Sequence, residues 1–324
     1  QAEDGIRDRS PSRGLGDVYK RQIEKWIAYS QYSHHWNFLH RKRQVGRQES
    51  ADFLEWSAKE VVLSVDDDPN LPPHLEFHEM SVRKVGGLYI GISGEFMAEP
   101  LWSERDGGNW RDHAHAHLGL YVSRDGLQWR RVGDPGPWVA NRAAGHIDYG
   151  FVTPTVAGQL VYGSKTHILY MATPDKQHWF NAESGHAIYP QADFKAAKAE
   201  WQALPDWPPR SRSIGALILR EDGWARLQPA YEHGRVITRQ FIFAGERLRL
   251  NADVNGGYIR VEILGPDFAP YRDFAAGDCT LIGRSDQTWH EVEWRGDLRT
   301  LWNQPVRLVF HLVQAHLYAF EFAP

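Results

Sequence analysis

The feature that most constrains this chain is a short turn motif that occurs twice. The segments 50–56 (SADFLEW) and 123–129 (SRDGLQW) share the pattern Ser-x-Asp-[Gly/Phe]-x-x-Trp, and Asp222-Gly223-Trp224 resembles a shortened third copy. Each copy separates two strand-like runs, so the Ser or Asp side chain is expected to bond the turn backbone and Trp to begin the next strand. A hairpin that recurs along a chain predicts a repeat architecture, here a β-propeller.

The strand-like runs group into three propeller-type sheets. The copies of the motif lie further apart than the roughly 40 to 50 residues of a compact blade, so long loops are expected. The middle sheet has four predicted strands, at 77–85, 88–92, 118–122 and 127–132. The following sheet has strands at 147–156, 166–172, 214–219 and 224–227, with a Pro- and Trp-rich insertion at about 179–212. The first sheet has only three, at 25–32, 44–49 and 54–63, without an inner strand.

A different pattern begins at about residue 229. Longer alternating strands are predicted at 236–243, 247–254, 258–264, 289–294, 306–313 and 316–322. In the fifth of these, Val306, Leu308 and Phe310 point one way while Arg307 and His311 point the other, as in a sheet with one buried side. The prediction is an all-β chain with a partial propeller at 23–228 and a β-sandwich at 229–324.

Composition excludes several function classes. The net charge is −4 with both signs interspersed, which argues against nucleic acid as a partner. No apolar run approaches the roughly 18 residues of a membrane span, so no membrane partner is expected. The single cysteine, Cys279, excludes a disulfide framework and a Cys-based zinc finger. Aromatic residues make up 13% of the chain, including 14 Trp, which favours stacking on sugars.

Residues 1–22 (QAEDGIRDRSPSRGLGDVYKRQ) carry almost no apolar periodicity and resemble translated sequencing-adapter read-through. They are interpreted as an artefactual or disordered tail and excluded from the fold. We therefore expect native sequence to start in mid-strand at about Ile23, and the upstream part of the propeller to be lost. The full-length protein is expected to be secreted or periplasmic rather than cytoplasmic.

Several segments together resemble a known arrangement. They are 47–57 (RQESADFLEWS), 87–91 (GLYIG), 123–129 with Arg131, 147–150 (IDYG), and the closing stretch from 305–308 (PVRL) to 318–320 (YAF). These segments resemble bacterial proteins described as five-bladed propellers similar to family 32 and family 43 glycoside hydrolases, with a C-terminal sandwich. The resemblance implies an incomplete five-bladed propeller of about three blades, with acidic residues of the innermost strands converging at a funnel.

Glycoside hydrolysis needs two carboxyl groups facing each other across the sugar. On the predicted inner strands the first candidate is Asp148, the second is Glu79, and Glu76 is the alternative if the register differs. On strand 77–85, extended by one residue to Glu76, simple alternation places Glu76 and His78 on one face and Glu79 on the other. The other interpretation is that these carboxylates bond to blade backbone or to a neighbouring arginine.

The remaining candidates concern binding rather than catalysis. Predicted substrate-binding residues are Arg47, His78, His146, Trp201 and Trp207. No cofactor is expected. A weak metal candidate is the group of three histidines that would project from one face of a strand, His113, His115 and His117, with Asp112 nearby. The preferred interpretation is a set of hydrogen-bonding histidines.

Two functions follow from these features. The first is a carbohydrate-active glycoside hydrolase that acts on a poly- or oligosaccharide. The second is a non-catalytic carbohydrate-binding or scaffold propeller, in which the funnel and the Trp-rich insertion hold a glycan by stacking. The preference for hydrolysis rests on analogy of fold, because one fold hosts many functions.

Overall fold

The computed structural model describes residues 25–33, 43–72, 75–97, 115–133, 136–143, 146–174 and 212–323. Within these residues the chain is built from β-strands, and its helical elements are two short 3-10 turns, η1 (Val65–Asp67) and η4 (Leu298–Leu301). The predicted all-β class is confirmed. The chain divides into two compact units, Ile23–Ile218 and one that contains Leu219–Pro324.

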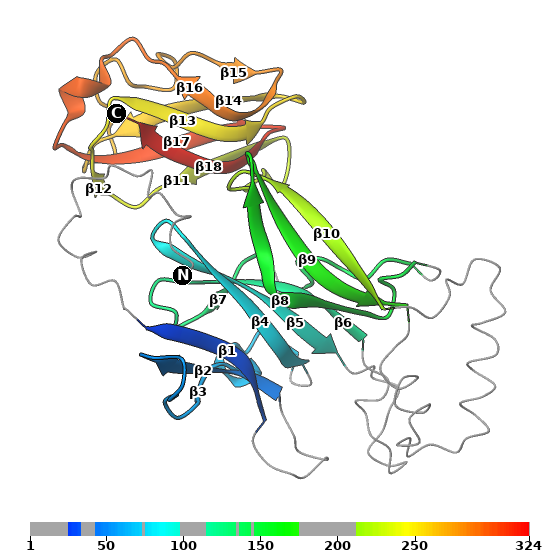
Figure 1. Ribbon diagram of the computed structural model, residues 1–324. Coiled ribbons are helices and arrows are strands. Elements are labelled where there is room, and N and C mark those ends of the chain that lie inside the picture. The colour runs from blue at the N-terminus through cyan, green and yellow to red at the C-terminus, as the bar shows by residue number, and fades with distance from the viewer. Residues whose placement is uncertain are drawn as a thin grey trace, which may run out of the picture. The chain divides into compact units, whose positions relative to one another are not determined.

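The unit Ile23–Ile218 holds the propeller-type sheets (Figure 1). The first sheet is antiparallel, in the order β1 (Trp26–Ser33), β2 (Arg43–Ser50), β3 (Glu60–Leu63). An antiparallel meander follows, formed by β4 (Leu75–Val85), β5 (Leu88–Met97), β6 (His115–Ser123) and β7 (Arg130–Arg131). The third group is β8 (Phe151–Tyr162), β9 (Lys165–Thr173) and β10 (Ser213–Arg220). A parallel pair between Ala116 and Phe151 links the second and third groups.

The two copies of the turn motif have the same local structure. In the first copy Asp52 Oδ1 accepts hydrogen bonds from the N–H groups two and three positions later, both at 2.9 Å. Asp125 Oδ1 does the same at 2.8 and 2.9 Å. The next residue has a positive φ in both copies, 66° at Phe53 and 73° at Gly126. The motif joins β2 to β3 and β6 to β7, so the repeat is a structural one.

Several strand boundaries differ from the sequence prediction, and three of the differences change how the first unit and its connection to the second are read. β8 begins at Phe151, and the residues before it form a turn closed by the Tyr149 N–H on the His146 carbonyl at 3.2 Å. The predicted strand at 54–63 is reduced to Glu60–Leu63, because the turn motif and the loop after it take up the preceding residues. The predicted outer strand at 224–227 is wrong, because Leu227 pairs with Leu317 instead.

The apolar core of the first unit lies between its first two sheets. Val45 and Leu63 from β2 and β3 pack with Phe77 and Tyr121 from β4 and β6, and all four side chains are buried. Phe77 and Tyr121 meet edge to face with ring centroids 5.7 Å apart. Both rings belong to the second sheet, and together with Val45 and Leu63 of the first sheet they bury apolar area where the two sheets meet.

The second unit is a sandwich of two antiparallel sheets. One sheet has the order β11 (His233–Ile237), β17 (Pro305–Val313), β14 (Tyr258–Leu264), β15 (Ile282–Gly283), with β12 (Phe241–Ile242) also pairing with β17. The other has the order β16 (Asp286–Val292), β13 (Arg247–Asp253), β18 (His316–Ala323). Val306, Leu308, Phe310 and Leu312 are at most 1% exposed, which confirms the alternation expected for this strand. The predicted strand at 236–243 is split between β11 and β12.

Some expectations fall outside the described residues. Trp201, Trp207, His113 and Asp112 lie there, as does all of the predicted insertion at 179–212 except its last residue. In the part of the chain that is described, no helix has the length and apolar character needed to cross a membrane.

Replacing Asp125 tests whether the turn motif stabilises the fold. The backbone N–H of Gln128 and then that of Leu127 hold the pKa of Asp125 below its ordinary value, although burial opposes them. By analogy with the loss of an N-cap, Asp125→Ala is expected to lower the free energy of unfolding by about 1 kcal/mol, measured by urea titration at pH 7.

The pH dependence of this effect follows from the lowered pKa. The contribution of ionised Asp125 is present above the unfolded pKa of about 3.9 and is lost as pH falls through the folded value. The stability difference between wild type and Asp125→Asn should therefore shrink in acid. Equal stability of wild type and Asp125→Ala at pH 7 would contradict the prediction.

Candidate functional site

A pocket of about 360 Å³, with polar and apolar lining residues, lies beside the start of β6. Its walls come from β6 and from the segment that leads to β8, and its lining residues are His115, His117, Pro137, Ala140, Asn141, Arg142 and Tyr149. The volume is at the lower end of the range for small-molecule sites, about 300 to 1,000 Å³. Donors, acceptors and an aromatic ring meet here, which makes it the candidate site of the first unit.

One wall of the pocket is formed by the segment after β7, which leaves β6 and then bonds to it again. After β7 the chain leaves β6 at Gly133 and Gly136, whose φ angles are 85° and 153°. It then returns, and the Trp138 N–H donates to the Leu118 carbonyl at 2.8 Å. Asn141 Nδ2 donates to the Ala116 carbonyl at 2.8 Å. These bonds hold the segment against β6 and position the residues that follow it.

Behind the pocket lies the buried carboxylate of Glu95. Its side chain is 1% exposed and receives bonds from three residues: Arg131 Nη2 at 2.7 Å, His117 Nε2 at 2.9 Å and the Tyr121 hydroxyl at 2.5 Å. Strand pairing places Glu95 opposite His117. A Cβ on Gly119 would overlap the Glu95 carboxylate, so the absence of a side chain there makes room for it.

The charge on Glu95 determines which ring nitrogen of neutral His117 carries the proton. Burial raises the pKa of Glu95, but the bonds from His117, Arg131 and Tyr121 outweigh it and leave the pKa below its ordinary value. Burial and the Glu95 charge raise the pKa of Tyr121 well above its usual range. An ionised carboxylate only accepts hydrogen bonds, so the proton of neutral His117 lies on Nε2. Nδ1 of His117 is then a hydrogen-bond acceptor.

Asp148 holds Arg142, the arginine among the lining residues of the pocket. It lies in the turn before β8, not on an inner strand, because the strand begins only at Phe151. Arg142 Nε donates to both Asp148 carboxylate oxygens, at 2.7 and 2.9 Å, and the Tyr170 hydroxyl lies 3.4 Å from Oδ2. This bonding raises the pKa of Arg142. Asp148 is 7% exposed, so it orients Arg142 from below the pocket surface.

A β-bulge changes the predicted faces of β4. Phe77 pairs with Glu95 and Met80 with Ser93, so His78 and Glu79 together lie opposite one residue of β5. The simple alternation that separated these two side chains is therefore wrong. Both are about a quarter exposed, and His78 Nδ1 contacts the Glu79 carboxylate. A bulge re-aims side chains in this way and is common beside active sites.

The other predicted residues are distributed over the unit. Glu76 is buried, 3.6 Å from Arg43 of β2. Arg47 is 7% exposed and bonds Glu49 at 2.6 Å, away from the pocket lining. His146 is exposed in the turn before Asp148. The pocket is therefore lined by the two described histidines of β6, and Asp148 bonds its lining residue Arg142 without lining it. Glu76, Glu79 and Arg47 do not line the pocket, and they contact residues outside its lining.

The described residues contain no group of three or more His, Cys, Asp or Glu side chains arranged to hold a metal ion. The rings of His115 and His117 are 6.0 Å apart, on one face of β6 as expected from their spacing. His117 directs Nε2 to Glu95. Within the described part, this histidine is thus a hydrogen-bonding group, and the interpretation of the set that includes His113 stays a prediction.

The sequence prediction missed Glu95, which bonds the lining residue His117, and also the lining residues Asn141, Arg142 and Tyr149. A signal for Glu95 exists, because it is the only charged residue in the otherwise uncharged strand LYIGISGEFM. A lone carboxylate in such a strand must find buried partners, since an unpaired buried charge is costly. Its partners, however, come from strands that only the fold brings together.

No protein family model and no curated protein matches the chain. Among solved structures it is similar to a protein described as a glycoside hydrolase, with 14% identity and a TM-score of 0.32 over 45% of this chain and 36% of that one. It is also similar to an N-acetylgalactosamine deacetylase from F. plautii solved with blood group B trisaccharide, with 17% identity and a TM-score of 0.31 over 46% and 37%.

A third similar structure is the GH32 β-fructofuranosidase of Bombyx mori, with 8% identity and a TM-score of 0.29 over 93% of this chain and 78% of that one. The chain thus spans little more than a third of the length of the first two proteins. At these identities and TM-scores, no substrate and no residue role transfers from these proteins to this chain.

The Glu95 network makes a testable prediction about stability. Glu95→Gln keeps the shape but leaves the Arg131 guanidinium without its buried counter-charge. It is expected to lower the free energy of unfolding by about 3 to 5 kcal/mol. The double variant Glu95→Gln, Arg131→Gln should lose less than the sum of the two single variants, because the pair acts as a unit. Additive losses in urea unfolding would show that the two groups are independent.

Proposed function

We propose that the pocket beside β6 binds a neutral sugar unit, and that the chain is part of a carbohydrate-active propeller protein. The proposal rests on one observation: carboxylates outside the lining fix two of the lining side chains. Glu95 bonds His117, and Asp148 bonds Arg142. Side chains fixed in this way lose little conformational freedom when a ligand binds. Such preorganisation suits a ligand whose many hydroxyl groups each need a partner.

The balance of charge points to a neutral ligand. The two carboxylates behind the walls are compensated, Glu95 by Arg131 and Asp148 by Arg142. The walls still offer hydrogen bonds of both kinds: Nδ1 of His117 accepts, Arg142 donates, and Asn141 has its carbonyl oxygen available because its amide N–H groups bond the Ala116 and Asp148 carbonyls. Sugar hydroxyls both donate and accept, and the Tyr149 ring supplies an aromatic wall.

Glycoside hydrolysis is a second candidate function, and the bulge on β4 favours it. The reaction needs one ionised and one protonated carboxyl group. In this proposal Asp148, paired with Arg142, is the ionised group. Glu79, partly exposed beside His78 on β4, the strand at the edge of its sheet, is the proton donor. Glu76 remains the alternative donor.

Binding is tested with a panel of neutral mono- and oligosaccharides, using saturation-transfer NMR followed by calorimetry. We expect Arg142→Ala to weaken binding of the recognised sugar by at least about tenfold, the loss of one charge-assisted hydrogen bond. The matched control is Arg130→Ala, an exposed arginine of β7 outside the pocket. Unchanged affinity in Arg142→Ala would refute this site, as would the absence of binding across the panel.

Hydrolysis is tested separately with chromogenic glycosides. If Asp148 is catalytic, Asp148→Asn should lower kcat by about a hundredfold or more, while the melting temperature stays nearly unchanged. Asparagine keeps an oxygen that can accept from Arg142 Nε, so the turn should persist. A lower melting temperature with activity retained would assign Asp148 to the framework and leave sugar binding as the function.

A further inference from the structure

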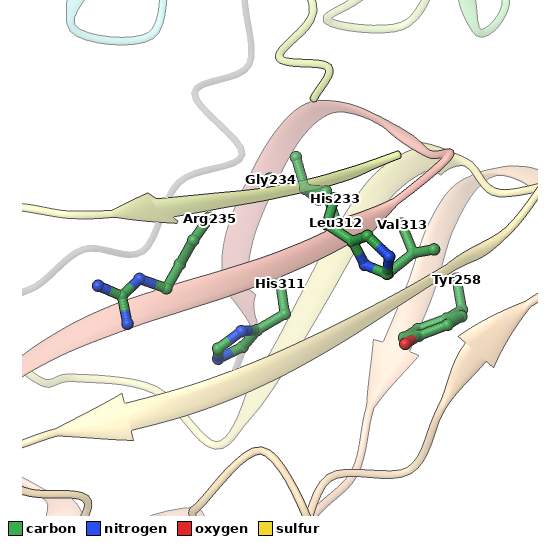
Figure 2. Close-up of a pocket in the computed structure, with 7 residues that line it drawn as sticks. All are labelled: His233, Gly234, Arg235, Tyr258, His311, Leu312 and Val313. Carbon is green, nitrogen blue, oxygen red and sulfur yellow. The ribbon is translucent and has the colours of Figure 1, made fainter. Parts of the chain in front are cut away.

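The second unit carries a polar pocket of its own, on the outer face of one sheet of the sandwich. The cavity measures about 340 Å³ and is lined by His233, Gly234, Arg235, Tyr258, His311, Leu312 and Val313. The side chains of Arg235, His311, His233 and Tyr258 lie along three neighbouring strands (Figure 2). These strands are β11, β17 and β14, far apart in sequence.

Strand pairing explains how these residues meet. Val313 pairs with His233 on one side and with Tyr258 on the other. Two residues earlier on β17, His311 pairs with Arg235 and with Arg260. Residues in one cross-strand row have neighbouring side chains, about 4.5 to 5.5 Å apart at Cβ. Because the residues between these rows face the apolar core, both rows face away from it.

The charges of this face are not balanced. His311 Nε2 lies 3.1 Å from the Glu262 carboxylate, so that acid already has a partner. Arg260 directs Nη1 to the Ala276 carbonyl at 3.4 Å, a bond that leaves its charge uncompensated. Arg235 is exposed and has no hydrogen bond or ion pair with any described residue. This differs from the pocket beside β6, where each charge has a counter-charge.

We propose that this face of the sandwich is a second binding site, specific for a saccharide that carries an acidic group. The Arg235 guanidinium binds the carboxylate or sulfate of the ligand, for which its planar fork of donors is suited. The Tyr258 ring packs against the sugar ring, and the two histidines bond its hydroxyls. The site is independent of the proposed sugar pocket in the other unit.

The form of the pocket favours a saccharide over a protein partner. A stable protein interface buries about 800 Å² per partner around an apolar centre. Here charged and polar side chains share the lining with Leu312 and Val313, and a cavity of small-molecule size contains both an arginine and an aromatic ring. A single acidic sugar unit fits that combination of size, charge and ring.

The test uses the full chain and three glucan or uronan probes: dextran sulfate, polygalacturonate and neutral dextran. Binding is followed by calorimetry at low and at high salt. We expect one or both acidic polymers to bind, dextran not to bind at this site, and affinity to fall with salt because exposed charges are screened. Binding to only one acidic polymer identifies the acidic group as sulfate or carboxylate.

Variants locate the binding on the sandwich. Arg235→Ala should weaken binding of the acidic polymer by at least about tenfold, and Tyr258→Ala should weaken it while Tyr258→Phe does not. Arg272→Ala, whose side chain is 95% exposed in the same unit but outside the pocket, is the matched control and should bind as wild type. Arg142→Ala should also bind the acidic polymer as wild type, which separates this site from the other pocket.

Three results would overturn the proposal. The first is no binding of either acidic polymer. The second is an equal loss of affinity in Arg235→Ala and Arg272→Ala, which would mean a general charge effect. The third is that poly-glutamate binds as tightly as the acidic glycans and depends equally on Arg235, which would identify the face as a site for acidic peptides.

Discussion

The buried carboxylate of Glu95 is the interaction on which the first unit depends most. It lies on β5, and its partners come from β6 and β7, so one side chain joins three strands of the middle sheet. Removing a carboxylate from water is costly, and only several hydrogen bonds together offset that cost. The same bonds fix the tautomer of His117 and hold Arg131 in place. The stability of the first unit and the geometry of its pocket therefore depend on the same hydrogen-bond network, and a change at Glu95 affects both.

The two pockets differ in whether their charged groups have counter-charges. Beside β6, carboxylates lie behind the walls and neutralise the arginines, so the walls offer hydrogen bonds without a net charge. On the sandwich, Arg235 has no ion pair with any described residue, and the Glu262 carboxylate contacts His311. A pocket that contains an unpaired cation favours an anionic ligand, whereas a compensated site favours a neutral one. The chain thus offers two different polar surfaces, one on each unit.

Local irregularity determines where the side chains of the first unit point. The bulge in β4 brings His78 and Glu79 together, although alternation in the sequence assigns them to opposite faces. The turn before β8 removes Asp148 from the strand and places it under Arg142. In both places the hydrophobic pattern is compatible with a regular strand. The bulge follows from the register of β4 against β5, and the turn before β8 is closed by its own bond from Tyr149 to His146 and joined to β9 by the bond from Gly150 to Thr173.

The sequence by itself determined the all-β class, the recurring hairpin and the alternating strands of the sandwich. These features depend on local rules: Asp and Gly in the turn at 125–126, and apolar residues at every second position of β17. Three groupings were decided only by the tertiary structure. Glu95 is buried among its hydrogen-bond partners, and Asp148 bonds Arg142. Arg235, His311 and Tyr258 line one pocket. The physical reason is that the Glu95 network and the sandwich pocket join strands distant in sequence, while the Asp148–Arg142 pair, only six residues apart, depends on the turn that takes Asp148 out of the strand. Their meeting depends on strand register and sheet order, and one residue of bulge or turn is enough to change it.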